Sequence, residues 1–139
     1  MIDCMIIGDS IAVGTHQFRP ECVAHAKGGW NTWQWNRDYL KNDLTAETVI
    51  ISLGSNDHKH IHTEAELLKM RAKIVGKRVF WILPAGNHPK SNVNIQYIQL
   101  TVKEIAAKYG DIVLPITRLQ RDGIHPSTAG YKEIARATK

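Results

Sequence analysis

The stretch TVIISLGSND (residues 48–57) joins a continuous apolar run to a short polar motif. Consecutive apolar residues rich in Val and Ile are typical of a strand that is buried on both faces of a parallel sheet. In an open α/β sheet, ligands bind outside the carboxyl ends of the strands, which is where this motif falls. The stretch therefore predicts a parallel sheet with polar residues gathered at one of its edges.

Strand-like and helix-like segments alternate along the rest of the chain. Apolar runs predict strands at residues 2–7, 22–26, 48–53, 78–83 and 111–115, and helical spacing predicts helices at 32–40, 64–75 and 92–109. Gly110 is placed to end the third of these helices, and Pro126, Ser127 and Thr128 open a last helix that runs to about Ala137. The alternation indicates a single three-layer α/β/α domain over residues 1–139, doubly wound around a five-stranded parallel sheet.

The composition is that of one ordinary globular domain. The chain has 139 residues, which is near the usual size of a single domain. Hydrophobic residues make up 43% and charged residues 22%, far from a disordered composition. The formal charge is +5, but Lys and Arg are dispersed, which disfavours a nucleic-acid partner. No apolar stretch approaches the ~20 residues of a membrane span, so no membrane partner is expected.

The two cysteines, Cys4 and Cys22, lie in the first apolar run and at the start of the second. They make no disulfide framework and no Cys-x-x-Cys motif, which favours buried free thiols in a reducing compartment. The N-terminus lacks a basic region, and its apolar run is too short for a signal peptide. These features predict a cytoplasmic protein, although phage-encoded proteins and specialised export routes would leave no trace in them.

Gly8-Asp9-Ser10 follows the first apolar run. Gly8 allows a tight exit from the strand, and Asp9 or Ser10 can cap the helix that follows. A serine at a helix N-terminus has a free backbone N–H and lies in a positive dipole field, which favours an activated hydroxyl and an emerging oxyanion. Ser10 is therefore a candidate nucleophile, and the alternative is that it only caps the helix.

Asp122-Gly123-Ile124-His125-Pro126 follows the last apolar run. A serine nucleophile needs a base, which itself needs orienting. Asp122 and His125 are three residues apart, so one loop can present the carboxylate to the imidazole Nδ1–H and leave Nε2 for the serine. Alternatively, Asp122 caps a turn and His125 is a surface loop residue.

Two further motifs supply hydrogen-bond donors. Asn56 offers a side-chain N–H after the third apolar run, and Gly29 offers a backbone N–H after the second. With the Ser10 amide they would form an oxyanion hole of the kind that stabilises a tetrahedral intermediate. Taken singly, Asn56 is also explained as a turn residue and Gly29 as a loop residue.

Taken in this order, the motifs resemble those of the SGNH hydrolase superfamily, also called GDSL esterases and lipases, over residues 8 to 126. The resemblance implies a flavodoxin-like SGNH hydrolase fold with Ser10 as the nucleophile and Asp122 and His125 as the other triad members. It also implies that Ser10, Gly29 and Asn56 form the oxyanion hole. The expected activity is hydrolysis of esters or thioesters, often of acetyl groups on carbohydrates, with no cofactor and no metal.

The chain departs from the family pattern at three points. Ile11 stands where the four-letter motif has Leu. Gly28 and Gly29 are adjacent, so the oxyanion glycine is ambiguous; Gly29 is preferred because Gly29-Trp30-Asn31-Thr32 better resembles the family block. The sequence between Ser10 and the second strand is short, which predicts an open, shallow site without a large substrate-binding insertion.

Histidines and tryptophans lie close to these motifs. His58, His60 and His62 could chelate a metal, but no matching carboxylates or cysteines accompany them, so a solvated loop is expected. His58 directly follows the Asn56 motif and is a candidate for lining the cleft. Trp30 is a candidate for stacking on a sugar ring or covering an acyl group, whereas helical spacing predicts core packing for Trp33.

The sequence thus predicts a small serine esterase that releases short acyl groups from a small-molecule or carbohydrate ester. One alternative is a non-catalytic carbohydrate- or ligand-binding module that keeps the fold, although a binder has no need of Ser10, Asp122 and His125 together. Another alternative is a metal-dependent phosphoesterase. Gly86-Asn87-His88 resembles one motif of such enzymes, but the Asp-x-His motif that they also need is missing. Acyl chain length, the alcohol portion and the oligomeric state stay open.

Overall fold

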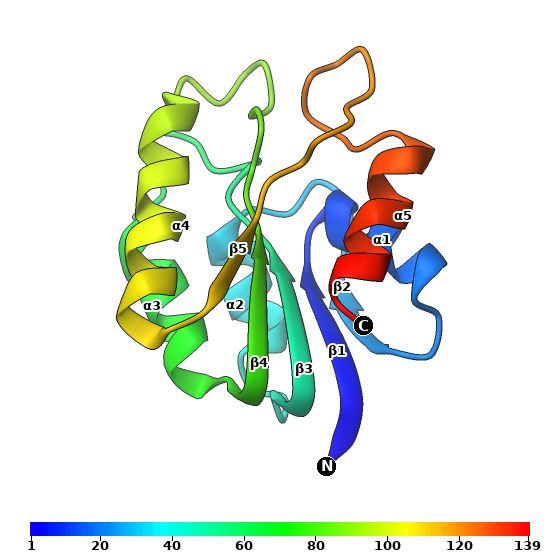
Figure 1. The fold of residues 1–139 in the computed structure, drawn as a ribbon. Helices are drawn as coiled ribbons and strands as arrows, with labels where there is room; N and C mark the ends of the chain where they lie inside the picture. Colours follow the sequence, from blue (N-terminus) through cyan, green and yellow to red (C-terminus); the bar gives the residue numbers. More distant parts are fainter.

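Five parallel strands form the central sheet, and helices cover both of its faces (Figure 1). The computed structural model describes residues 1–139. The strands are β1 (Ile2–Gly8), β2 (Val23–Ala26), β3 (Thr45–Ser52), β4 (Val75–Ile82) and β5 (Ile112–Leu114). The helices are α1 (Ser10–Phe18), α2 (Thr32–Tyr39), α3 (Thr63–Lys73), α4 (Ile95–Tyr109) and α5 (Thr128–Ala137). None of these helices combines the length and the apolar character that crossing a bilayer requires.

Each face of the sheet has its own apolar core. Helices α1 and α5 lie on one face, and α2, α3 and α4 lie on the other (Figure 1). The core under α2–α4 contains the fully buried Trp35 and Trp81, and the core under α1 and α5 contains Ile11 and Ile134. Because side chains of both faces are buried, the strands are apolar on consecutive positions. The three-layer α/β/α arrangement with a five-stranded parallel sheet is therefore confirmed.

The strand order β2-β1-β3-β4-β5 brings the ends of β1 and β3 together. Gly8 at the end of β1 lies opposite Ser52 of β3 on one side and Ala26 of β2 on the other. β2 and β3 lie on opposite sides of β1, so the chain reverses its direction across the sheet at β1. The carboxyl ends of β1 and β3 therefore form the switch point where ligands bind in such sheets. A Cβ on Gly8 would lie 1.8 Å from the carbonyl oxygen of Ser52, so only glycine allows this close approach.

The boundary between α3 and β4 differs from the predicted one. The helix predicted at residues 64–75 ends at Lys73, and Val75 instead begins β4. Val75 and Gly76 pair with Thr45 and Ala46 of β3, although the first half of β4 is largely exposed. The backbone ladder thus extends beyond the apolar run, and a hydrophobicity pattern does not reveal that extension.

Helix α4 shows both kinds of helix-end signal. It begins at Ile95 rather than at residue 92, because the side chain of Asn94 accepts a hydrogen bond from the Gln96 amide and caps the helix. Gly110 ends it in the left-handed conformation with φ of 72°, as predicted.

Cys4 and Cys22 form a disulfide bond, so the prediction of free thiols is wrong. Cys4 lies in β1, and Cys22 directly precedes β2, which pairs with β1. This pairing brings the two Cα atoms to 4.8 Å, within the range that a disulfide needs. Disulfides persist mainly in oxidising compartments, so the cysteines do not support the expectation of a reducing one.

Trp33 of α2 does not pack in the core, so the prediction for this residue is wrong. Trp33 is 50% exposed, whereas Trp35 is fully buried and its indole Nε1 donates to the carbonyl of His25 at 2.8 Å. Residues two apart on a helix point in different directions, so only one of them can face the core. The core tryptophan of α2 is Trp35.

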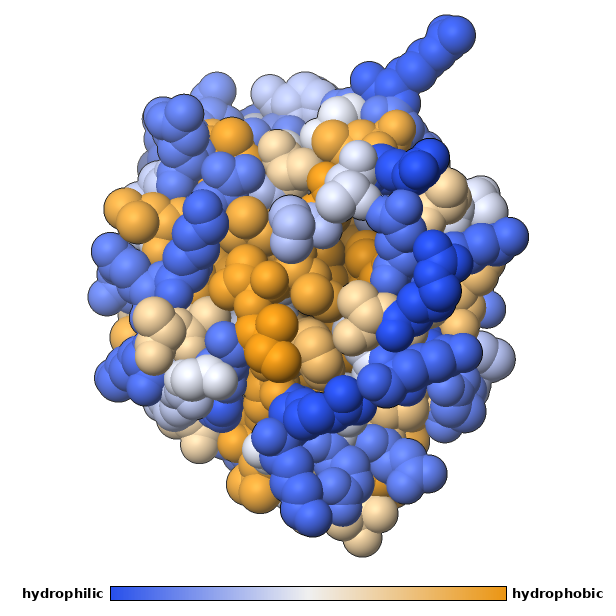
Figure 2. All heavy atoms as spheres, viewed as in Figure 1, coloured by the Kyte–Doolittle hydropathy of each residue, from blue (hydrophilic) through white to orange (hydrophobic).

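The edge strand β5 adjoins an apolar area of the surface. Figure 2 shows this hydrophobic area between α4 and α5. Within it, a hollow of about 210 Å³ is lined mainly by residues of β5, the segment after it and α5. None of the predicted site residues lines this hollow, so the polar site is a separate feature of the molecule.

Candidate active site

Ser10 is the first residue of α1, directly after β1. Asp9 is the N-cap, since its Oδ1 accepts a hydrogen bond from the amide of Ile11 at 3.0 Å. Capping by Asp9 therefore excludes the alternative in which Ser10 serves as the cap. The amide of a first helical residue has no acceptor within its helix, so the Ser10 N–H stays available to a ligand.

The side chains of Ser10, His125 and Asp122 are hydrogen-bonded in series. The distance from Ser10 Oγ to His125 Nε2 is 2.8 Å, and the distance from His125 Nδ1 to Asp122 Oδ2 is 2.6 Å. The side chains of His125 and Asp122 are 34% and 41% exposed, so the arrangement is open to solvent. The structure thus brings Ser10 together with two residues that lie more than a hundred positions further along the chain.

A tight turn between β5 and α5 fixes the relation between Asp122 and His125. Asp122 Oδ1 accepts hydrogen bonds from the amides of Ile124 at 2.9 Å and His125 at 3.0 Å, while Gly123 adopts a left-handed conformation with φ of 68°. The two backbone amides and the His125 side chain lower the pKa of Asp122 to about 2. Asp122 is therefore an ionised acceptor at neutral pH, which assigns the Nδ1–H tautomer to a neutral His125.

Gly29 and Asn56 lie on two neighbouring loops. The Gly29 amide donates to no acceptor in the protein, and the same holds for Gly28. A Cβ on Gly28 would lie 3.8 Å from the Cβ of Ser10, whereas Gly29 has φ of 79° and open space around it. Asn56 Nδ2 donates to the carbonyl of Trp30 at 3.1 Å, which fixes the orientation of its amide and leaves its second N–H free.

Asp57 ties the Asn56 loop to α2. It is fully buried and accepts three hydrogen bonds, from the amide of Thr32 at 2.8 Å, from the Thr32 hydroxyl at 2.8 Å and from the Thr63 hydroxyl at 2.6 Å. Burial raises the pKa of Asp57 above its usual value. Asp57 therefore fixes the position of the Asn56 loop, a role that the Gly54-Ser55-Asn56-Asp57 motif by itself does not reveal.

Asp9 is a fully buried carboxyl beside Ser10. Its Oδ1 accepts from Ile11 N and from the Ser52 hydroxyl at 3.1 Å, but its Oδ2 has no hydrogen-bond partner. Desolvation raises the pKa of Asp9 from 3.8 to about 7, against the lowering effect of these hydrogen bonds. The sequence predicts Asp9 only as a possible helix cap.

The raised pKa of Asp9 predicts that the protein loses stability as pH rises from about 4 to about 7. In this window the folded state binds a proton that the unfolded state has released, so the free energy of unfolding falls with pH, by at most roughly 4 kcal/mol in all. Asp9→Asn keeps the cap and removes the titration, so its free energy of unfolding should vary less between pH 5 and pH 8.

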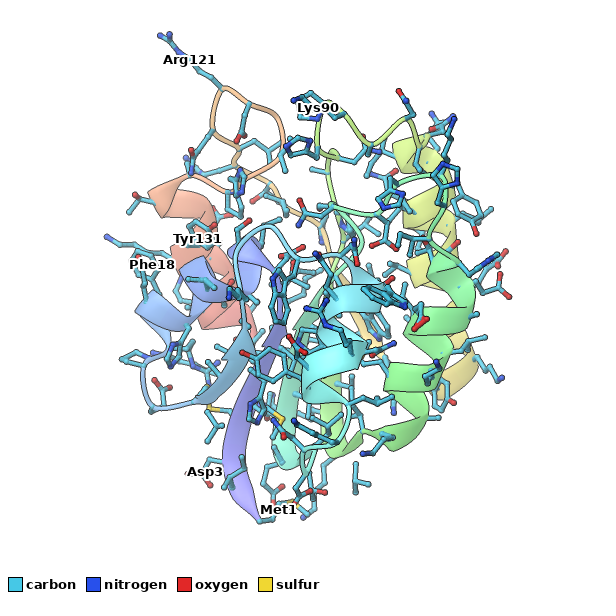
Figure 3. The ribbon with its side chains drawn as sticks, turned by 180° about the vertical axis from the view of Figure 1, so that it is seen from behind. Met1, Asp3, Phe18, Lys90, Arg121 and Tyr131 are labelled. Carbon is cyan, nitrogen blue, oxygen red and sulfur yellow. A yellow bond between two sulfur atoms is a disulfide. The ribbon has the colours of Figure 1, made fainter.

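Urea denaturation at the two pH values tests this expectation. The exposed Asp3 lies at the opposite end of the molecule from Arg121 and Lys90 (Figure 3), so Asp3→Asn is the matched control. Equal pH dependence in the wild type and Asp9→Asn would show that Asp9 does not titrate in this range.

A polar cavity of about 370 Å³ adjoins Gly29 and Asn56. His58 is among its lining residues, and none of them is hydrophobic; a role of His58 in substrate binding stays a prediction. The loop between β4 and α4 contributes His88, Lys90 and Ser91, for which the sequence predicts no role at this site. No spacing signal could have found them, because only folding brings this loop beside the Asn56 loop.

Trp30 lies next to the site with its ring packed against protein groups. The ring centroid is 5.8 Å from that of Tyr39, and Lys27 and Arg37 lie over the ring at 5.0 and 5.6 Å. Its carbonyl is the acceptor for Asn56. A role of the Trp30 ring in substrate binding stays a prediction.

Solved structures of other proteins share this fold at low sequence identity. A proposed acylhydrolase from Bacteroides fragilis is 19% identical with a TM-score of 0.69, over 96% of this chain and 83% of that one. A proposed lipolytic protein of the G-D-S-L family from Desulfitobacterium hafniense is 18% identical with a TM-score of 0.62, over 98% and 97% of the two chains. The C-terminal catalytic domain of peptidoglycan O-acetyltransferase A from Streptococcus pneumoniae, solved with a methylsulfonyl adduct, is 17% identical with a TM-score of 0.65, over 99% and 96%.

Comparisons of sequence alone give a different result. No protein-family model matches this chain, and no curated protein matches its sequence. At identities below one fifth, the solved structures establish the fold and leave the chemistry to be argued from the residues. The chain therefore has the fold of the SGNH hydrolases, as its motifs indicate.

Proposed function

We propose that this protein is a serine ester hydrolase that works by acyl transfer through Ser10. The observation that carries this proposal is the hydrogen-bonded series from Ser10 Oγ to His125 Nε2 at 2.8 Å and from His125 Nδ1 to Asp122 Oδ2 at 2.6 Å. A nucleophile, a base and a group that orients the base are the parts that this chemistry needs. They stand at the switch point of an SGNH-type fold.

In acylation, Ser10 Oγ attacks the ester carbonyl carbon while His125 Nε2 takes the hydroxyl proton. The carbonyl oxygen becomes an oxyanion that accepts hydrogen bonds from the Ser10 amide, the Gly29 amide and the free Asn56 side-chain N–H. His125 then gives its proton to the leaving alkoxide oxygen, the carbon–oxygen bond breaks, and an acyl-serine and an alcohol result. Asp122 keeps the neutral imidazole in its Nδ1–H tautomer and stabilises the transient imidazolium.

Deacylation repeats these steps with water as the nucleophile. His125 removes a proton from water, the hydroxide adds to the acyl carbon, and the same donors hold the second oxyanion. Collapse of this intermediate returns the proton from His125 to Ser10 Oγ and releases the acid. Every proton is moved by His125, so the cycle needs no cofactor or metal ion.

Short acyl esters, including acetyl esters of carbohydrates, are the proposed substrates. Support comes from the openness of the site and from the fold shared with the peptidoglycan O-acetyltransferase domain. Hydrolysis and transfer use the same acyl-serine and differ only in whether water or an alcohol attacks it.

The function is tested with p-nitrophenyl esters from acetate to octanoate, together with a fluorophosphonate probe. We expect hydrolysis that EDTA does not affect, stoichiometric labelling that stops it, and the label on the peptide that contains Ser10. Labelling without ester hydrolysis would indicate a narrow natural substrate. If the probe does not label the protein and no ester is hydrolysed, a binding module is favoured. Loss of activity with EDTA would indicate metal-dependent chemistry.

Asn56→Ala is expected to lower kcat by about 10²–10³ and to change KM much less. The oxyanion forms only in the transition state and the intermediate, so its donor acts mainly on kcat. Steady-state kinetics on the best ester of the series separates the two constants. A change confined to KM would instead make Asn56 a residue that positions the substrate.

A further inference from the structure

The cavity beside the oxyanion donors is lined by residues from three regions of the chain, and none of them is hydrophobic. Gly29, Asn31 and Gln34 come from the region where α2 begins, and Asn56 and His58 follow β3. The remaining lining residues, His88, Lys90 and Ser91, follow β4. No aspartate or glutamate is among the lining residues.

The N-terminal capping box of α2 leaves the side-chain amide NH₂ groups of Asn31 and Gln34 free. Asn31 Oδ1 accepts from the amide of Gln34, and Gln34 Oε1 accepts from the amide of Asn31, both at 2.9 Å. These bonds fix the orientation of both side-chain amides, with each acceptor oxygen engaged in the box. Asn31 Nδ2 and Gln34 Nε2 make no hydrogen bond within the protein, and neither atom is fully buried. Both side-chain N–H groups are therefore accessible from solvent as donors.

The two histidines also present donors. His58 Nδ1 accepts a hydrogen bond from the His60 amide, and His88 Nδ1 accepts one from the Lys90 amide, each at 3.2 Å. A neutral imidazole that accepts at Nδ1 carries its proton on Nε2. Both rings therefore have an Nε2–H to donate, and the Lys90 ammonium adds three further donors and a positive charge.

We propose that this cavity binds an anionic, acceptor-rich group on the acyl part of the substrate. Charge-assisted hydrogen bonds to a carboxylate are the strongest that such donors can make, whereas an alkyl chain would leave them desolvated and unpaired. The cavity is lined by Gly29 and Asn56 but not by His125. His125 must reach the leaving oxygen, so the alcohol part of the substrate lies on the same side of Ser10 as His125. The acyl part then lies in the cavity.

This inference rests on the proposed esterase function and is tested with a matched pair of esters. Mono-p-nitrophenyl adipate and p-nitrophenyl hexanoate both have six-carbon acyl chains. The adipate chain ends in a carboxylate, and the hexanoate chain ends in a methyl group. We expect kcat/KM to be higher for the adipate ester by about tenfold or more. The alcohol side is tested separately by comparing 4-acetoxybenzoate with its methyl ester, for which no preference is expected.

Two substitutions locate the preference in the cavity. Gln34→Glu keeps the capping box, because glutamate is favoured at this helix position, but replaces a donor with an anionic oxygen. Lys90→Met keeps most of the unbranched stem of the side chain and removes its charge. Each should lower the ratio of adipate to hexanoate kcat/KM by about tenfold. Lys59→Met is the control and should leave the ratio unchanged, because Lys59 adjoins His58 but lines a different cavity.

The possible failures are distinguishable. Ser10-dependent hydrolysis of both esters at equal rates, or a ratio that Lys59→Met lowers as much as Lys90→Met, would overturn the cavity assignment and leave the esterase intact. A preference seen only for 4-acetoxybenzoate would place the anion on the alcohol and overturn the assignment too.

If neither ester is hydrolysed, ligand binding tests the cavity assignment, and the esterase proposal itself fails only if the fluorophosphonate probe also leaves Ser10 unlabelled. Monomethyl adipate is then titrated into ¹⁵N-labelled Ser10→Ala protein, whose 15.7 kDa mass suits NMR. Chemical-shift changes around Gln34 and Lys90 that Gln34→Glu removes would support the cavity as an anion site. No shift up to about 10 mM ligand would overturn it.

Discussion

Replacing Ser10 with alanine is expected to lower kcat/KM for ester hydrolysis by about 10⁴ or more. The substitution removes the only atom that the proposed mechanism bonds covalently to the substrate. What remains is the oxyanion hole and the binding contacts, which by themselves give a small residual rate. The ester that the wild type hydrolyses fastest is the substrate for this comparison.

The fold should tolerate Ser10→Ala. The only hydrogen bond of the Ser10 hydroxyl is to His125, and the cap of α1 is made by Asp9. The melting temperature of the variant should therefore match that of the wild type, and a loss of activity would be chemical in origin. A variant that keeps activity within tenfold of the wild type would show that Ser10 is not the nucleophile.

Asp122→Asn is expected to lower kcat by on the order of 10⁴. The asparagine Oδ1 can still accept from the amides of Ile124 and His125, so the turn is retained. Its side-chain NH₂, however, can donate to His125 Nδ1, which moves the imidazole proton to Nε2. Nε2 then faces Ser10 as a donor and is unable to take the serine proton.

A pH series and a control variant separate this effect from a general change of charge. The pKa of Asp122 is about 2, so the wild-type carboxylate stays ionised throughout the usual assay range and the deficit of Asp122→Asn should persist across it. Asp3→Asn, at the far end of the sheet, should keep wild-type activity (Figure 3). A loss of less than about tenfold in Asp122→Asn would mean that another group orients His125.

The site could be predicted in outline because its chemistry is confined to short motifs at strand ends. Asp122 and His125 lie in one turn, so their mutual contact depends only on local geometry. Their contact with Ser10 follows from a parallel sheet, because all strands then end at one edge. The apolar runs were sufficient to predict that sheet.

Other features were missed because they depend on which elements become neighbours. Cys4 and Cys22 bond because β2 pairs with β1, and the strand order is absent from any local pattern. Trp33 and Trp35 have the same hydrophobic character in sequence, and only the placement of α2 on the sheet decides that Trp35 is buried.

The sequence by itself determined the α/β class, the parallel strands and the four motifs, because hydrophobic periodicity and turn chemistry are local properties of the chain. The tertiary structure alone decided the strand order, the burial that raises the pKa of Asp9 and the cavity of donors around Lys90. Desolvation and long-range hydrogen bonding depend on residues that are distant in the chain and adjacent only after folding.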